Sequence, residues 1–371
     1  MKYTFSLFFC LMVLLFFTQC DKKEETRNSK SEKEKPARLF IVVSESKLGY
    51  INREGKIVIK PQFDNAWKFT EGLAAVNIGG KWGFIDNEGK YIINPQFDDV
   101  WSFSDGLARV KIGDKRGYIN KEGKYIVNPQ FDLAGSFSDG LALVEIGNKI
   151  GYINKEGKYI INPQFDGAWN FSNNIAVVKI GNKYGYVNKE GKYIINPQFD
   201  EADDFFDGLA CVKIGDKCGY ISYEGKYIIN PQFEIAWNFS DGLARVRIGD
   251  KRGFIDKRGK YIINPQFDIA NDFADGLAMV KIGNKAGYIN KEGKYIINPQ
   301  FEEANDFIEG LALVKTGGKA GYIDKEGKYI INPQFDDASD FSDGLAFVRI
   351  GGKVGYIDKE GKYVWNWNPS N

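Results

Sequence analysis

From residue 39 to about residue 368, short runs of alternating apolar and polar residues are separated by glycine-containing turns. The run LARVKI, at Leu107–Ile112, alternates in the way that is typical of a half-buried β-strand. Gly113 and Asp114 then give a two-residue hairpin signal before the next run, RGYIN. An asparagine at position 120, followed by KEG, indicates a three-residue hairpin loop with a bulge, and KYIVN follows as a third strand. Each unit is therefore predicted to be a three-stranded antiparallel meander.

The same pattern returns every 34 residues. The prolines of a PQF motif lie at positions 61, 95, 129, 163, 197, 231, 265, 299 and 333. A fixed period of this length marks a solenoid, a propeller or an array. The pattern opens with LFIVV, at Leu39–Val43, and closes with KYVWNWNPSN, which gives ten whole units with atypical sequences at both ends. Because atypical ends suit caps on an open stack, we expect an all-β fold of tandem 34-residue three-stranded antiparallel units in an open β array, with a closed β-propeller as the alternative.

The turn positions fix the register of the strands within a unit. Val110 should face Gly117, and Ile119 should face Ala108 and Tyr125. One sheet face is then apolar and must be covered: Ala108, Val110, Gly117, Ile119, Tyr125 and Val127. The opposite, mixed face should pack in part against the next unit: Leu107, Arg109, Lys111, Arg116, Tyr118 and Ile126. Pro163 is expected to end its strand, because proline cannot donate to a β-ladder.

The segment KWGFIDNEGKYIINPQFDDVWSFSDGLARV, at Lys81–Val110, resembles the bacterial WG repeat, also called the KWG repeat. The resemblance extends from residue 39 to about residue 368. It implies an extracytoplasmic β-repeat protein with binding roles and with no settled biochemical activity. The tryptophan before the glycine is present only at Trp82, so the resemblance transfers no role of that tryptophan to the other units.

The N-terminal segment resembles a bacterial lipoprotein signal. The apolar run Leu7–Phe17 has the length of a signal peptide and is too short to span a bilayer comfortably. FTQC follows, and Cys20 would receive the lipid, unless the segment is an ordinary signal peptide with an incidental cysteine. We expect a signal peptide at residues 1–19, a lipidated cysteine and charged tether at 20–38, and the repeat array at 39–371. The expected location is the cell envelope, anchored by lipid on the extracytoplasmic side, at the periplasmic face or the cell surface.

The composition argues against several classes of function. Lysine and arginine number 50 against 49 aspartate and glutamate residues, so the net charge of +1 gives no strong field for nucleic acid. The chain contains no histidine, the commonest general base and the commonest metal ligand. No nucleophile with a base, phosphate loop or metal cluster is recognisable in the sequence. We therefore expect no enzymatic activity, no cofactor, no bound metal and no nucleic-acid partner.

Residues present in every unit, such as Phe165, are predicted to be scaffold, so a distributed function should lie where units differ. The first variable position follows the PQF motif and is occupied by Trp67, Trp101, Trp169 and Trp237 in four units. These tryptophans could stack on sugars or anchor a protein partner, or they could cap the local core. Two further positions vary together, as Arg109 with Arg116 and Arg245 with Arg252. These arginines could bind an anion or be solvated surface residues.

Aspartates follow the first variable position late in the chain: Asp204, Asp272, Asp306 and Asp340. They could bind calcium, although their spacing lacks the alternating oxygens of a calcium loop. The leading hypothesis is a lipid-anchored envelope repeat protein that acts as a binding or scaffold module for protein or glycan. The rival hypothesis is an envelope hydrolase that uses the connector aspartates, including Asp203, and a pocket with carboxylates of raised pKa would favour it.

Cys211 and Cys218 flank one predicted two-residue turn, which places them as diagonal neighbours on one sheet face. Diagonal neighbours lie roughly 7–8 Å apart, whereas disulfides usually need less than about 7 Å between Cα atoms. We therefore expect free or only partly oxidised thiols.

Overall fold

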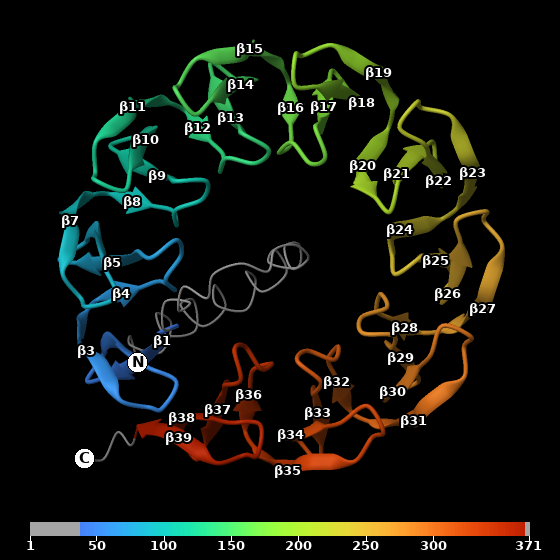
Figure 1. The fold of residues 1–371 in the computed structure, drawn as a ribbon. Coiled ribbons are helices and arrows are strands. Elements are labelled where there is room, and N and C mark those ends of the chain that lie inside the picture. Colours follow the sequence, from blue (N-terminus) through green and yellow to red (C-terminus); the bar gives the residue numbers. More distant parts are fainter. Residues whose placement is uncertain (1–37, 368–371) are drawn as a thin grey trace, which may run out of the picture. The chain divides into compact units, whose positions relative to one another are not determined.

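The computed structural model describes residues 38–367, which form one compact unit of strands and turns. Ten antiparallel sheets follow one another along this part of the chain, and Figure 1 shows them as the blades of a closed ring. The expected signal peptide, Cys20 and the tether up to residue 37 lie outside the described residues. In the described range, no helix is long and apolar enough to cross a membrane.

The strands of blades 1 to 5 are β1 (Phe40–Ser44), β2 (Lys47–Ile51) and β3 (Ile57–Phe63); β4 (Asn65–Ala66), β5 (Ala74–Ile78), β6 (Lys81–Ile85) and β7 (Tyr91–Phe97); β8 (Asp99–Val100), β9 (Leu107–Ile112), β10 (Lys115–Asn120) and β11 (Tyr125–Phe131); β12 (Leu133–Ala134), β13 (Leu141–Ile146), β14 (Lys149–Asn154) and β15 (Tyr159–Phe165); β16 (Gly167–Ala168), β17 (Ile175–Ile180), β18 (Lys183–Asn188) and β19 (Tyr193–Phe199).

The strands of blades 6 to 10 are β20 (Glu201–Phe206), β21 (Leu209–Ile214), β22 (Lys217–Ile221) and β23 (Tyr227–Phe233); β24 (Ile235–Ser240), β25 (Leu243–Ile248), β26 (Lys251–Asp256) and β27 (Tyr261–Phe267); β28 (Ile269–Ala270), β29 (Ala278–Ile282), β30 (Lys285–Ile289) and β31 (Tyr295–Phe301); β32 (Glu303–Ala304), β33 (Ala312–Thr316), β34 (Lys319–Ile323) and β35 (Tyr329–Phe335); β36 (Asp337–Ala338), β37 (Ala346–Ile350), β38 (Lys353–Ile357) and β39 (Tyr363–Trp367).

The three predicted strands of each unit are present, with the predicted register. In blade 3, Val110 pairs with Gly117, Ala108 with Ile119, and Ile119 with Tyr125. The second turn also forms as predicted, because the Gly123 amide donates to the Asn120 carbonyl at 2.9 Å and Gly123 has a positive φ of 79°. The three-stranded core of the unit is thus confirmed.

The connector between units adds a fourth strand that the sequence pattern did not reveal. In blade 3, β8 pairs with β9, and an equivalent strand recurs in blades 2 to 10, with six residues in blades 6 and 7 and two in the others. A tight turn joins the two strands: Asp105 and Gly106 have φ of 56° and 82°, the positive pair that a type I′ hairpin needs. The connector strands lie on the inner side of the ring, and the third predicted strand of each unit lies on the rim (Figure 1).

Two details of the predicted strands were wrong. β15 continues through Pro163 to Phe165, because it is the rim strand and its free edge does not require a donor at that residue. In blade 3, Val127 pairs with Tyr118 and therefore belongs to the opposite face from the one predicted. A bulge causes the change, since the register shifts between Tyr118 and Ile119. The register also shifts between Arg116 and Tyr118, and there a Cβ on Gly117 would lie 2.4 Å from the Val127 carbonyl oxygen, so only glycine fits.

The hydrophobic core lies between successive blades. One core cluster joins Phe84, Ile93 and Phe97 of blade 2 to Ala108, Val110 and Ile119 of blade 3, and Tyr125 packs against it. The next cluster joins Leu107, Tyr118, Val127 and Phe131 of blade 3 to the first strands of blade 4. Both faces of a blade are therefore covered by its neighbours, as sheet faces of this composition require.

The ring closes where blade 10 meets blade 1, a contact that we call the seam. The Tyr356 hydroxyl donates to the Ile41 carbonyl at 3.0 Å, and the Phe40 and Tyr356 rings lie 5.7 Å apart. Arg38 forms an ion pair with Asp343, and the Arg53 guanidinium lies against Gly344. The expected open array is thus wrong, and the fold is a ten-bladed β-propeller. In an open array, the outer faces of the first and last blades would stay uncovered, and the seam buries them.

Candidate functional site

The structure brings the three variable positions of each unit together. We call these three residues the variable trio of a blade. In blade 3 the Arg109 guanidinium lies 3.5 Å from the centre of the Trp101 ring, and Arg116 follows across the hairpin. In blade 2 the Trp67 and Trp82 rings are 5.3 Å apart. The trios of blades 2 to 10 are Trp67, Ala75 and Trp82; Trp101, Arg109 and Arg116; Gly135, Leu143 and Ile150; Trp169, Val177 and Tyr184; Asp203, Cys211 and Cys218; Trp237, Arg245 and Arg252; Asn271, Met279 and Ala286; Asn305, Leu313 and Ala320; and Ser339, Phe347 and Val354.

The arginines of a trio reach the inner strand of the next blade. Arg109 donates to the Ala134 carbonyl, and Arg116 donates to the Asp132 carbonyl. Blade 7 repeats this arrangement, since Arg245 donates to the Ala270 carbonyl and Arg252 to the Asp268 carbonyl. This shared pair of acceptors gives a physical reason why the two positions vary together.

The arginine–tryptophan stacks are partly removed from water. Burial lowers the pKa of Arg109 to about 10, so the side chain stays charged at neutral pH. In blade 7 the Arg245 and Arg252 guanidiniums lie 4.1 Å and 5.8 Å from the centre of the Trp237 ring. These four arginines, Arg109, Arg116, Arg245 and Arg252, therefore link blades through carbonyls, and three of them also approach a tryptophan ring. Their predicted role in ligand binding stays a prediction.

The four connector tryptophans differ in exposure. Trp67 packs partly buried against the core between blades 2 and 3, and Trp101 and Trp237 lie under arginines. Trp169 is 44% exposed, and its ring centre lies 5.5 Å from that of Tyr184. The Lys179 ammonium lies 5.1 Å from the centre of the Tyr184 ring. Trp169 and Tyr184 thus form an aromatic surface that a ligand can reach.

The connector aspartates lie on one arc of the ring, in blades 6, 8, 9 and 10. Asn271 donates to Asp306, and Asn305 donates to Asp340, each at 3.0 Å between successive blades. Partial burial raises the pKa of Asp272 and of Asp340. It also raises the pKa of Asp204, with a further contribution from the charge of Asp203. Within residues 38–367, no group of three or more histidine, cysteine, aspartate or glutamate side chains is arranged to hold a metal ion.

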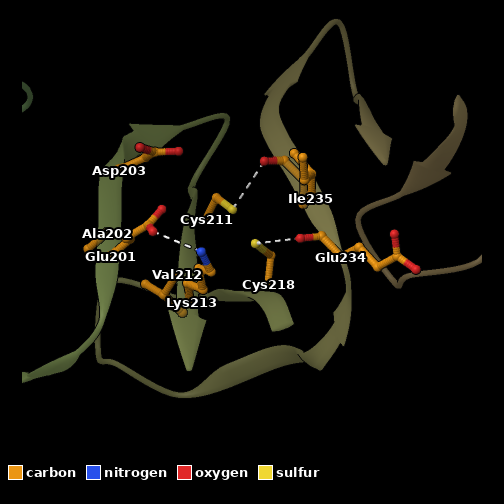
Figure 2. A pocket seen from close by; sticks show the side chains of 10 residues that line it. Glu201, Ala202, Asp203, Cys211, Val212, Lys213, Cys218, Glu234 and Ile235 are labelled. Carbon is orange, nitrogen blue, oxygen red and sulfur yellow. Dashed lines mark hydrogen bonds and ion pairs between the residues drawn. The ribbon is translucent and has the colours of Figure 1, made fainter. Parts of the chain in front are cut away.

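A cavity of about 210 Å³ lies between blades 6 and 7, beside Cys211 and Cys218 (Figure 2). Both cysteines are buried and free, and the predicted register is correct, because Cys211 pairs with Tyr220 and Cys218 with Lys213. The interaction between the two neighbouring thiols raises the pKa of Cys211 and lowers that of Cys218. Asp203 and Glu201 also line the cavity, and partial burial raises the pKa of Asp203. The sequence pattern alone does not bring these residues together, because the fourth strand that carries Asp203 has no visible signal in it.

The chain matches the family model described as WG containing repeat in nine successive segments, at residues 49–82, 82–115, 117–149, 150–184, 184–218, 219–251, 253–285, 287–319 and 321–353. A comparison with curated proteins gave no match.

Among solved structures, the chain is similar to one described as the eukaryotic initiation factor, with 12% identity and a TM-score of 0.53 over 89% of this chain and 96% of that one. It also matches Hsv2p of Kluyveromyces lactis, with 10% identity and a TM-score of 0.38 over 63% of this chain and 96% of that one. At such identity, the likeness to the initiation factor concerns the fold alone. The nine family matches span most of the propeller, and the chain therefore belongs to the WG-containing repeat family.

Proposed function

We propose that this protein is a lipid-anchored binding or scaffold module of the bacterial cell envelope, with a protein or glycan ligand. The observation that carries the binding role is the exposed aromatic surface formed by Trp169 and Tyr184. Large aromatic side chains are usually mostly buried, so an indole that is 44% exposed next to a second ring is a candidate for contact with a sugar face or an apolar side chain. The scaffold around it repeats in every blade, whereas this pair occurs in blade 5.

Replacing Trp169 by alanine tests the binding role. The protein is screened against a glycan array and a panel of envelope proteins, and Trp169→Ala should weaken the observed binding about tenfold or more, as the loss of a central aromatic anchor does. Ile180→Ala is the matched control, because Ile180 is 37% exposed in the same blade and lies at a hairpin tip. Unchanged binding by Trp169→Ala, or an equal loss in Ile180→Ala, would contradict the proposed surface.

The lipid anchor rests on the apolar run that ends in FTQC. Cys20→Ser should release the protein from membranes or block its processing, because the lipid is attached to that thiol. Detergent-phase partitioning and intact mass measure both outcomes. A variant that stays in the detergent phase with an unchanged mass would show that Cys20 carries no lipid.

A second candidate function is an envelope hydrolase that uses the connector aspartates. The raised pKa of Asp203, which lines the cavity between blades 6 and 7, favours it, because a general acid needs a pKa near the working pH. Glycosidase and esterase substrates would detect such an activity. Turnover that is lost in Asp203→Asn would support the hydrolase over the binding module.

A further inference from the structure

The cavity between blades 6 and 7 exists because blade 6 has the trio Asp203, Cys211 and Cys218. In blades 3 and 7 the same three positions hold a tryptophan and two arginines. Two short thiols replace two long guanidinium side chains, and a carboxylate replaces an indole. Figure 2 shows both thiols pointing toward the start of blade 7. The arginines of the other two blades extend to the equivalent part of the blade that follows them.

Two carbonyls in each of blades 4 and 8 accept hydrogen bonds from guanidiniums. The two equivalent carbonyls of blade 7 have weaker donors. The equivalent acceptors are the carbonyls of Glu234 and Ala236. The Glu234 carbonyl accepts a hydrogen bond from the Cys218 thiol at 3.9 Å, and the Ala236 carbonyl accepts one from the Cys211 thiol at 3.6 Å. A thiol is a weak donor, so both carbonyl oxygens can still accept a hydrogen bond from a stronger donor. Both lie at the edge of an accessible cavity.

The charges around the cavity favour a cation. Asp203 and Glu201 line it with carboxylates, against the single ammonium of Lys213, whereas Glu234 presents its carbonyl and directs its carboxylate away from the cavity (Figure 2). Lys213 is already paired with Glu201 at 2.8 Å, and Glu234 accepts the Gly249 amide at 3.1 Å. This leaves the Asp203 carboxylate, whose partial burial disfavours its charged form, as the group with most to gain from a bound cation.

A guanidinium matches these acceptors better than an ammonium does. It is planar, carries five donors in a fixed fork and is more weakly hydrated than an ammonium. A cavity of about 210 Å³ suits a head group with a short alkyl stem. We propose that the cavity between blades 6 and 7 binds an alkylguanidinium, either a free small molecule or an arginine side chain of a peptide, through the Glu234 and Ala236 carbonyls and the Asp203 carboxylate.

Calorimetry on the intact protein tests the proposal with butylguanidinium as the probe and pentylammonium as its matched control. Butylguanidinium should bind about tenfold or more tightly than pentylammonium, and Asp203→Asn should weaken it about tenfold, as expected for loss of a charge-assisted hydrogen bond. The double variant Cys211→Arg with Cys218→Arg has arginine at both positions, as blades 3 and 7 do. It should abolish binding, because the two arginine side chains fill the cavity. A comparison with an acetylated, amidated arginine peptide distinguishes the two sources, since tighter binding of the peptide assigns the site to a protein ligand.

A second measurement needs no variant and so does not depend on the folding of the double variant. Butylguanidinium should slow the alkylation of Cys218 in the native protein, because it occupies the cavity beside the thiol, and pentylammonium should not. Equal binding of the two cations, binding that survives in a folded double variant, or alkylation that butylguanidinium leaves unchanged would each overturn the proposal. The site shares no residue with the Trp169–Tyr184 surface, so failure here leaves the proposed function intact, and the reverse also holds.

Discussion

At the scale of single residues, one buried hydroxyl explains how a variable position can change without loss of the fold. Tyr118 donates to the Gly135 carbonyl at 2.7 Å, and Tyr186 donates to the Asp203 carbonyl at 2.8 Å. Both acceptors are backbone atoms of the first trio position in the next blade, so the bond does not depend on the side chain there. The sequence placed Tyr118 on the correct face but gave no sign of an acceptor 17 residues away in another blade.

Tyr186→Phe should lower the free energy of unfolding by about 1–2 kcal/mol, because it leaves the Asp203 carbonyl without this donor. The ring itself fits without a hydroxyl, since blade 7 has Phe254 at the equivalent position. Tyr91→Phe is the control, as the Tyr91 hydroxyl has no hydrogen-bond partner within the described residues. Denaturant unfolding measures both variants, and an equal effect of the two would mean that the bond between blades contributes nothing.

At the scale of elements, the last residue of the PQFD motif joins successive blades. Asp200 accepts from Lys183 of blade 5 at 2.6 Å and from the Gly215 amide of the blade 6 hairpin at 2.7 Å. The hydrogen bond from Lys183, followed by that from Gly215, lowers the pKa of Asp200. The same pair of bonds is made by Asp64, Asp98, Asp132, Asp166, Asp268 and Asp336. The motif is thus a link between blades, as its recurrence indicated.

The stabilisation by Asp200 should depend on pH. Because its pKa is lower in the folded protein, it stabilises the fold above the ordinary aspartate pKa of about 3.9, and this effect is lost as the pH falls toward the folded value. The Asp200→Asn variant should therefore have a lower Tm than the native protein at pH 7 and the same Tm near pH 2. Thermal melting at a series of pH values measures the difference. A gap in Tm that stays constant down to pH 2 would contradict the assigned role.

The strands and turns of a unit could be predicted because their signals are local. Asn120 and Gly123 define one hairpin, and the alternation of Leu107–Ile112 defines a strand. The bulge that moves Val127 to the other face could not be predicted, since the alternation of KYIVN gives no sign of the extra residue between Tyr125 and Val127. The inner strand was missed although Asp105 and Gly106 give a type I′ signal, because two paired residues are too few for a visible alternation.

At the scale of the whole molecule, the number of units followed from the sequence, whereas ring closure did not. A repeat pattern specifies what each blade does with its neighbours, and closure depends on a small rotation summed over ten blades. The atypical ends suggested caps, yet Phe40, in the first of them, packs against Tyr356 of the last blade at the seam. The candidate site was predicted as separate positions on a connector and a hairpin. The contacts within each variable trio appeared only when the connector was placed as the inner strand.

Ten blades form a closed ring, so that blade 10 is the neighbour of blade 1. Spin labels at Lys47 and Lys353, which are equivalent exposed residues of the first and last blades, test it by pulsed electron–electron distance measurement in a protein whose four native cysteines are replaced by serine. Labels at Lys149 and Lys183, the same position in blades 4 and 5, give the matched distance for adjacent blades. The closed ring predicts the same distance distribution for both pairs. A distance between residues 47 and 353 far longer than that between residues 149 and 183 would show that the blades form an open array.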